Sequence, residues 1–252
     1  MSVSTWTGTS ARISDLTEDD LPCSDGEPME TQRHVLQMLL LVESLSLHWM
    51  DRQDFFVAGN MFVYYRKEGR TRHEALGPDV FVALDVPRRE RKSWVVWQEG
   101  KGPDVVIELL SESTAARDRG AKMRIYRDVL RVAEYFWYDP FSDEWARFEL
   151  RDGSYLPIQP DAAGRLPSRR LGLVLTREDG EYISVPARWL RWATPEGVVL
   201  TTAAEAAAQQ QQRAEHEQQR AEHEQQRADQ EQQRAERLAA KLRALGVDPD
   251  WF

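Results

Sequence analysis

The sequence predicts an α/β domain with a mixed central sheet flanked by helices, followed by a long charged helix. Short β-branched runs alternate with two helical patterns, and the order helix, strands, helix, strand is typical of a mixed sheet with helices on its faces. From about Thr201 a seven-residue repeat replaces this alternation. A chain of 252 residues is long enough for one such domain and an appendage.

The N-terminal part begins with a polar, acidic stretch, which predicts a flexible arm over residues 1–23 and a folded domain over 24–200. A helix is expected from Glu30 to about His48, because its apolar residues recur at helical spacing. The strands expected after it cover 55–58, 61–65, the segments around 80–82 and 105–110, then 134–138, 145–150 and 155–158.

A second helix is expected from about Thr114 to Val129, with Ser113 or Thr114 as its N-cap. A polar linker at 87–92 separates the two β-branched strands at the centre of the domain, and residues 94–97 are expected to be ordered within it.

The C-terminal repeat predicts a charged helix over residues 201–246 and a short tail over 247–252. Oppositely charged residues recur at helical spacing, which favours a helix. In a coiled coil, two positions of each seven-residue repeat form the seam between the helices and are normally apolar. Here alanine occupies the first of these positions and glutamate occupies the second in every repeat before Leu238, so the seam is poor. A weak coiled coil that forms a homodimer and a lone charged helix both fit; His216 and His223 fit solvated repeat positions better than a metal site.

Composition limits the class of protein. The 33 Lys and Arg residues against 42 Asp and Glu residues give a formal charge of −9, which excludes a basic coat for nucleic acid but not a local basic surface. The one cysteine, Cys23, allows neither an intrachain disulfide nor a cysteine metal cluster. No stretch approaches the roughly 20 apolar residues of a membrane span, and the first residues do not resemble a signal peptide. We therefore expect a cytoplasmic protein with no membrane partner.

Two acidic residues stand beside or within the β-branched strands, and they are the main functional signal. Asp79 precedes one strand and Glu108 lies inside another, where a carboxylate is costly unless it is paired, hydrogen-bonded or holding a metal. If the strands are neighbours, these carboxylates could hold Mg²⁺ or Mn²⁺. Lys122, on the following helix, shares a face with Asp118 and Tyr126 and could stabilise charge on a phosphate.

Each of these residues also has a plain structural interpretation. Asp118 and Lys122 form an ordinary ion pair at helical spacing, and Asp79 after a proline is typical of a turn. Glu108 is harder to explain in this way, because a structural glutamate is uncommon between Ile107 and Leu109 in a buried strand.

Taken in order, several segments resemble the Uma-type family of proposed bacterial restriction endonucleases, in the PD-(D/E)XK nuclease superfamily. The resemblance covers about residues 24–200. The segments are 24–31, 77–82 and 103–111, then Asp118 with Lys122, and finally 134–140.

The resemblance implies a restriction-endonuclease-like core, a Mg²⁺ or Mn²⁺ cofactor and hydrolysis of DNA phosphodiester bonds. Asp79 matches the Asp of the PD element, Glu108 matches the second acid, and the Leu109 carbonyl matches a backbone metal ligand. Leu110 occupies the position of the superfamily's usual lysine, so Lys122 is the candidate. Glu30 resembles an accessory metal-binding acid, and its alternative role is a favourable charge at a helix N-terminus.

Basic residues offer candidate contacts to the DNA backbone. Arg117, Arg124, Arg127 and Arg131 are expected along one stripe of the second helix, and Arg88, Arg89, Arg91 and Lys92 cluster in the linker. They could neutralise phosphates or simply form a solvated face. No base-reading motif is evident, so sequence preference is not predicted.

Two hypotheses follow from the sequence. The first is a metal-dependent DNA endonuclease that uses Asp79, Glu108 and Lys122. The second is a catalytically inactive protein with a nuclease fold, acting as a DNA-binding or assembly module through its C-terminal helix. A serine or cysteine hydrolase has little support, because Cys23 lies in the expected arm and no histidine has a plausible triad context.

Overall fold

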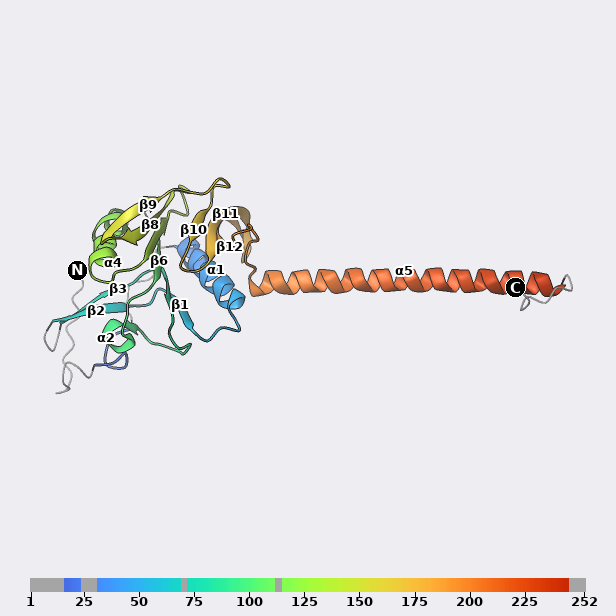
Figure 1. Ribbon diagram of the computed structural model, residues 1–252, viewed down its shortest axis with the longest axis horizontal. Coiled ribbons are helices and arrows are strands. Elements are labelled where there is room, and N and C mark those ends of the chain that lie inside the picture. Colours follow the sequence, from blue (N-terminus) through green and yellow to red (C-terminus); the bar gives the residue numbers. More distant parts are fainter. Residues whose placement is uncertain (1–15, 24–30, 69–71, 112–114, 245–252) are drawn as a thin grey trace. The chain divides into compact units, whose positions relative to one another are not determined.

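The computed structural model describes residues 16–23, 31–68, 72–111 and 115–244 (Figure 1). Glu30, the proposed caps Ser113 and Thr114, and the tail over 247–252 lie outside these residues. The chain divides into two compact units, Met1–Thr202 and Ala203–Phe252, which are described separately.

The mixed central sheet that the sequence predicts forms the centre of the first unit, and it has six strands. Its spatial order is β1-β4-β6-β7-β8-β9, and every neighbouring pair is antiparallel except β6 and β7. The strands are β1 (Phe55–Gly59), β4 (Val80–Leu84), β6 (Val105–Leu109), β7 (Glu134–Tyr138), β8 (Trp145–Arg151) and β9 (Ser154–Ile158).

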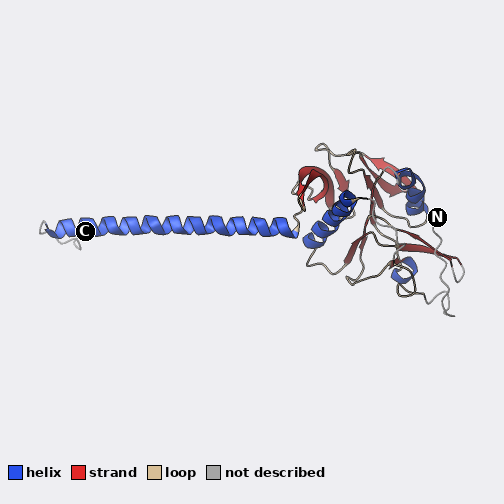
Figure 2. Cartoon of the chain, turned by 180° about the vertical axis from the view of Figure 1, so that it is seen from behind, coloured by secondary structure: helices blue, strands red, loops and turns tan. Residues whose placement is uncertain are grey.

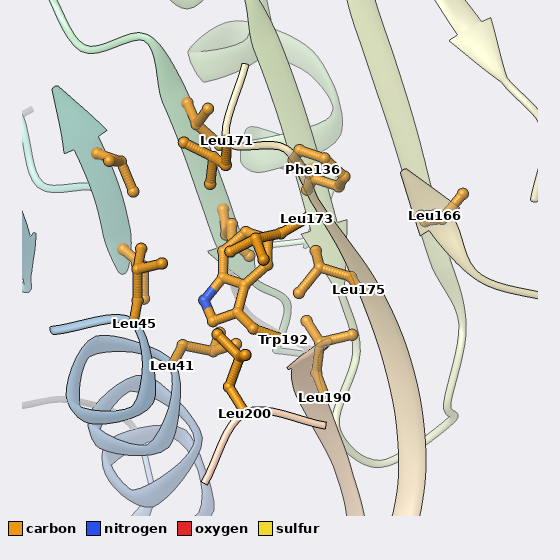
Figure 3. Close-up of a cluster of buried hydrophobic side chains, with 14 of the residues drawn as sticks. Leu41, Leu45, Phe136, Leu166, Leu171, Leu173, Leu175, Leu190, Trp192 and Leu200 are labelled. Carbon is orange, nitrogen blue, oxygen red and sulfur yellow. The ribbon is translucent and has the colours of Figure 1, made fainter. Parts of the chain in front are cut away.

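Helix α1 (Gln32–His48) and a three-stranded sheet cover one face of the central sheet (Figure 2). The small sheet consists of β10 (Leu166–Ser168), β11 (Leu173–Tyr182) and β12 (Val185–Ala193). Figure 3 shows Trp192 and Leu190 of β12 among Leu41 of α1, Phe136 of β7 and Leu175 of β11. This apolar core fixes α1 against the strands that carry the acidic residues.

The opposite face is covered by the second predicted helix and by another three-stranded sheet. That sheet has the order β3-β2-β5, with β2 (Val63–Glu68), β3 (Arg72–Leu76) and β5 (Trp94–Val95), and a short helix α2 (Val96–Glu99) follows β5. The predicted strands at 55–58 and 61–65 therefore do not pair with each other. β1 pairs with β4 in the central sheet, whereas β2 pairs with β3 and β5.

The second predicted helix is divided into three segments. A single turn, α3 (Ala115–Arg117), leads into a π-helical turn (Asp118–Lys122) and then into α4 (Met123–Asp128). The π-helical turn has Asp118 at its first position and Lys122 at its last, and both side chains are buried. Such wide turns are frequent at functional sites.

Part of the predicted flexible arm is attached to the domain. Leu16 and Leu21 are buried, Trp97 donates a hydrogen bond to the Leu16 carbonyl, and Tyr64 donates one to the Pro22 carbonyl. Apolar residues spaced through an acidic stretch therefore attach residues 16–23 to the β3-β2-β5 sheet and to α2, which the polar composition alone did not predict.

The second unit contains helix α5 (Ala203–Ala244), a helix of 42 residues whose side chains are almost all exposed. Four glutamines each donate a hydrogen bond to an acid four residues later, from Gln211 to Glu215 through Gln232 to Glu236. These pairs stabilise an exposed helix without a core. Among the described residues, no helix combines the length and the apolar character that crossing a membrane requires.

Candidate active site

Asp79 and Glu108 lie on the same face of the central sheet, on adjacent strands. Side chains alternate along a strand, so Asp79 points to the side of Phe81, and Glu108 points to the side of Val106. Phe81 and Val106 both belong to the core beneath α4. Because β4 and β6 are antiparallel, the start of β4 lies beside the end of β6, and the two acids meet there.

Asp79 is fixed by the backbone of the neighbouring strand. Its Oδ2 accepts a hydrogen bond of 2.7 Å from the Leu109 N–H, just beyond the last registered β4–β6 pair, Val80 with Ile107. The carboxylate thus satisfies a backbone donor that the end of β4 leaves without a strand partner. Asp79 is partly exposed, so a ligand can approach the acids from its side.

Glu108 is fully buried and is held by two side chains from the following helix. Lys122 Nζ lies 3.0 Å from Glu108 Oε2, and the Tyr126 hydroxyl donates a hydrogen bond of 2.7 Å to Glu108 Oε1. Tyr126 is itself buried, with its ring 5.4 Å from that of Tyr135. Both carboxylate oxygens therefore have a fixed direction, as a preorganised site requires.

Lys122 also pairs with a second acid. Its Nζ lies 2.8 Å from Asp118 Oδ1, and the backbone carbonyl of Asp118 accepts a hydrogen bond from the Tyr135 hydroxyl. The sequence predicted this ion pair as the structural alternative for Lys122. In the structure Lys122 contacts both Asp118 and Glu108, so its ion pair with Asp118 does not exclude a role beside Glu108.

The cluster carries more negative than positive charge. Three carboxylates, Asp79, Glu108 and Asp118, surround one ammonium, so two negative charges are uncompensated when all four groups are ionised. Burial, followed by the charges of Asp79 and Asp118, raises the pKa of Glu108 to about 8, although Lys122 and Tyr126 oppose this.

The other two titrating members respond to the same imbalance. Burial raises the pKa of Asp79, although Lys122, the Leu109 N–H and a hydrogen bond with Glu108 lower it. Burial lowers the pKa of Lys122, but the surrounding carboxylates, Glu108 first, outweigh that effect and raise it. When no other cation is bound, the pair Asp79 and Glu108 therefore holds one proton more readily than isolated carboxyl groups do.

Comparison with known proteins gives the family. The Uma2 profile, described as "Putative restriction endonuclease", matches residues 15–185, which is more than half of the chain. The chain belongs to the Uma2 family. The sequence resemblance to Uma-type proteins is thereby confirmed.

One curated relative and one solved structure illustrate the range of this similarity. The uncharacterized protein slr1290 of Synechocystis is 32% identical over 97 residues, which is 38% of this chain and 48% of that protein's length. The match thus spans about half of that relative. A crystal structure described as a putative nuclease of DUF820 from Anabaena variabilis has a TM-score of 0.43 and 16% identity, covering 62% of this chain and 90% of its own.

The acids of this Uma2 chain have the chemistry that a hard divalent cation needs. Mg²⁺ and Mn²⁺ prefer carboxylate oxygens, often one or two of them plus waters. Asp79 and Glu108 provide such a pair, and their uncompensated charge provides the attraction. No three His, Cys, Asp or Glu side chains come close enough for a metal cage in the described part of the chain. The residues therefore fit an ion bound by two carboxylates better than an all-protein cage.

The backbone of Leu109 is oriented toward Asp79. The next N–H, of Leu110, bonds to the Tyr138 carbonyl on β7. Backbone groups of successive strand residues point to opposite sides, so the N–H and carbonyl of Leu109 both point toward β4. Its role as a metal ligand stays a prediction, as does that of Glu30, which lies outside the described residues.

The predicted arginine stripe is only partly formed. Arg117 and Arg124 are exposed on α3 and α4, whereas Arg127 binds the carboxylate of Asp128 at 2.6 Å. Arg131 follows the end of α4 with a φ of 55°, so it does not continue the helix. A contact of Arg117, Arg124 or Arg127 with substrate stays a prediction.

The basic linker lies far from the acids. It follows the C-terminal end of β4, whereas Asp79 precedes the strand, and five strand residues span roughly 17 Å. Arg89 binds Glu18 and Glu99, Arg91 is buried against Glu99, and Lys92 N–H binds Glu18. Arg88 instead donates to the Met50 carbonyl. Most of this cluster is thus paired within the chain, and a contact of its cations with phosphates stays a prediction.

Sequence reasoning gave no role to two residues that support the site. The sequence predicts Tyr126 on the helix face of Lys122 but does not predict its contact with Glu108, and it predicts no role for His34. His34 Nε2 lies 3.1 Å from the Leu110 carbonyl, and its Nδ1 lies 2.8 Å from Thr31 Oγ1, the N-cap of α1. The four-residue spacing of Asp118, Lys122 and Tyr126 was the signal for Tyr126; nothing in the sequence indicated His34.

Proposed function

We propose that this Uma2 protein is a metal-dependent endonuclease that hydrolyses phosphodiester bonds of DNA in the cytoplasm. The proposal depends above all on one observation. Asp79 and Glu108 meet on one face of adjacent strands, and Lys122 reaches Glu108 from the next helix at 3.0 Å. Two acids with an amine at this end of a mixed sheet match the arrangement that the family resemblance implies.

Each residue has a separate task in this proposal. Asp79 and Glu108 would hold the cation, which would supply a positive charge to polarise a phosphate oxygen and to lower the pKa of a water. Lys122 donates to the phosphate oxygen on which negative charge develops, and its low exposure keeps that interaction strong. Tyr126 keeps the Glu108 carboxylate in a single orientation.

The test is cleavage of supercoiled plasmid and linear DNA by the full chain with Mg²⁺ or Mn²⁺. Glu108→Ala and Asp79→Asn are expected to lose cleavage and metal binding by calorimetry, with the far-ultraviolet circular dichroism unchanged. Glu181→Ala, an exposed acid on β11, is the matched control and is expected to cleave like the wild type. Cleavage that persists unchanged in Glu108→Ala would contradict these assignments.

A second candidate function is assembly through α5. Its exposed 42-residue helix has a heptad repeat, and Leu238 is 54% exposed on it. The repeat gains a leucine at its seam only from Leu238 on, and a seam leucine is buried when two helices pair, so we infer a second copy of the chain as the partner. This homodimer is compatible with an endonuclease, and it would be the main function if the site proves inactive.

A further inference from the structure

The turn between β7 and β8 lies next to the candidate active site. β7 is parallel to β6, with Tyr138 in register with Leu109, so the turn begins at the same sheet end as Glu108. Inside the turn, Asp139 Oδ1 accepts hydrogen bonds from the N–H groups of Phe141 and Ser142, at 2.8 and 3.1 Å. The turn is therefore a fixed feature of this sheet end.

Phe141 is presented to solvent at the tip of this turn. It is 66% exposed, and it is the one exposed Phe, Tyr or Trp side chain in the described part of the chain. Its ring lies 5.7 Å from that of His34, which contacts the Leu110 carbonyl two residues after Glu108. An aromatic ring kept in water beside a candidate catalytic site indicates a ligand with an apolar flat face.

Arg119 lies on the other side of the same sheet end. Its guanidinium is 4.2 Å from the centre of the Trp137 ring, and Trp137 is in register with Glu108 on the neighbouring strand. Paired residues of adjacent strands share a face, so Arg119 extends over the face that carries Glu108. Its acidic partner, Glu144, is 3.0 Å away and has 63% of its side chain exposed, so the pair is weak and easily exchanged.

The two side chains together match a single-stranded nucleic acid. A base exposes its flat face for stacking only when it is unpaired, and a cation held on an aromatic ring suits a phosphate. The overall charge of −9 and the paired basic linker leave little cationic surface for a long duplex. Stacking therefore has to supply more of the affinity than phosphate contacts do.

We propose that Phe141 stacks on an unpaired base of the substrate and that Arg119 binds the adjacent backbone phosphate. Both residues lie at the sheet end where β6 finishes with Glu108 and Leu109, so the preferred DNA has a single-stranded segment at this end. This inference rests on the proposed function in one respect, namely that DNA is the substrate.

The test is equilibrium binding of the full chain, without divalent cation, measured by fluorescence anisotropy. The probes are a labelled oligothymidine of about 20 nucleotides and a duplex of the same length. Phe141→Ala is expected to weaken binding of the single strand by at least about fivefold and of the duplex by less than about twofold. Phe141→Trp retains a ring and is expected to bind the single strand like the wild type.

Arg119→Gln is expected to weaken binding of both probes and to reduce the slope of log affinity against log salt by about one. Two variants are matched controls because they change similar exposed residues elsewhere. Leu156→Ala removes an exposed apolar side chain of β9, and Arg151→Gln removes an ion-paired arginine at the opposite end of β8. Both are expected to bind as the wild type does.

The outcomes separate this inference from the proposed function. Equal loss on both probes in Phe141→Ala, or no loss on the single strand, overturns the stacking role while plasmid cleavage still supports the endonuclease. A wild-type chain that binds neither probe and cleaves no DNA overturns both.

Discussion

Lys122 Nζ lies 3.0 Å from Glu108 Oε2, although the two residues are 14 positions apart in the chain. The residue two positions beyond Glu108 is Leu110, which is fully buried, so the strand itself provides no cation. The helix that follows provides it instead, from the last position of its π-helical turn. The amine thus depends on the packing of that helix against the sheet, and not on the strand alone.

Replacing Lys122 by methionine tests this dependence. The variant keeps the length of the side chain but leaves Glu108, Asp118 and Asp79 without their cation. We expect cleavage to fall by at least about 100-fold. Losing one partner of a buried ion pair also lowers the free energy of unfolding by about 3–5 kcal/mol, measured by urea titration at pH 8.

The matched control is Lys101→Met. Lys101 pairs with Asp104, which precedes β6 and so lies at the opposite end of that strand. That variant is expected to lose some stability but no cleavage activity. Equal losses of cleavage in the two variants would indicate a purely structural role for Lys122.

Glu108 and Lys122 can be predicted from local sequence patterns. A carboxylate inside a β-branched strand is uncommon, and Asp118, Lys122 and Tyr126 share a helix face by spacing alone. Non-local features were not predictable. The sequence does not predict β10 to β12, because the charged residues 177–179 and Gly180 interrupt the apolar pattern within β11, and only pairing with β12 makes it one strand.

The separation of β1 from β2 has the same cause. Both segments have good strand composition, and a turn at Gly59-Asn60 suggests a hairpin, but tertiary pairing places them in different sheets. The π-helical turn also cannot be predicted from the sequence, because the choice between α and π hydrogen bonding depends on how the buried side chains of Asp118 and Lys122 pack in the folded domain.

The pKa of Glu108 makes stability depend on pH. Burial, aided by Asp79 and Asp118, raises this pKa from 4.5 to about 8. Between these values the folded chain holds a proton that the unfolded chain has lost, so stability falls as pH rises through this window. The slope is at most about 1.4 kcal/mol per pH unit for one group. Thermal unfolding from pH 5 to 8.5 without divalent cation measures it.

Glu108→Gln is expected to flatten this dependence, because the amide does not titrate. Adding Mg²⁺ is expected to stabilise the wild type more at pH 8 than at pH 6, since the ion competes with the proton for the carboxylates. An identical pH slope in the wild type and Glu108→Gln would show that other groups cause it.

Tyr126→Phe tests the orientation of Glu108. The hydroxyl donates 2.7 Å to Glu108 Oε1 and thereby lowers the pKa of that carboxyl against the effect of burial. Without it, we expect the acidic limb of the pH–rate profile to move to higher pH and cleavage to fall about tenfold. The free energy of unfolding is expected to fall by about 1 kcal/mol.

Tyr155→Phe is the control for that stability effect. The Tyr155 hydroxyl donates to the Val132 carbonyl at 3.0 Å and does not contact the acids. The control should therefore lose similar stability with an unchanged pH–rate profile. A shift of the profile in both variants would argue against a specific role for Tyr126.

Deleting residues 203–252 tests whether α5 assembles the chain. Residues 1–202 form a compact unit with its own core, so the truncated chain should stay folded and retain cleavage. If α5 pairs with a second copy, sedimentation equilibrium should give a dimer for the full chain and a monomer for the truncated one. Leu238→Glu, at one of the few apolar seam positions, should weaken the dimer by at least about tenfold.

Glu222→Gln, an exposed change on the same helix, should leave the dimer intact, because only the seam is expected to contact the partner. A full chain that sediments as a monomer would instead identify α5 as a lone helix held by its own side-chain pairs.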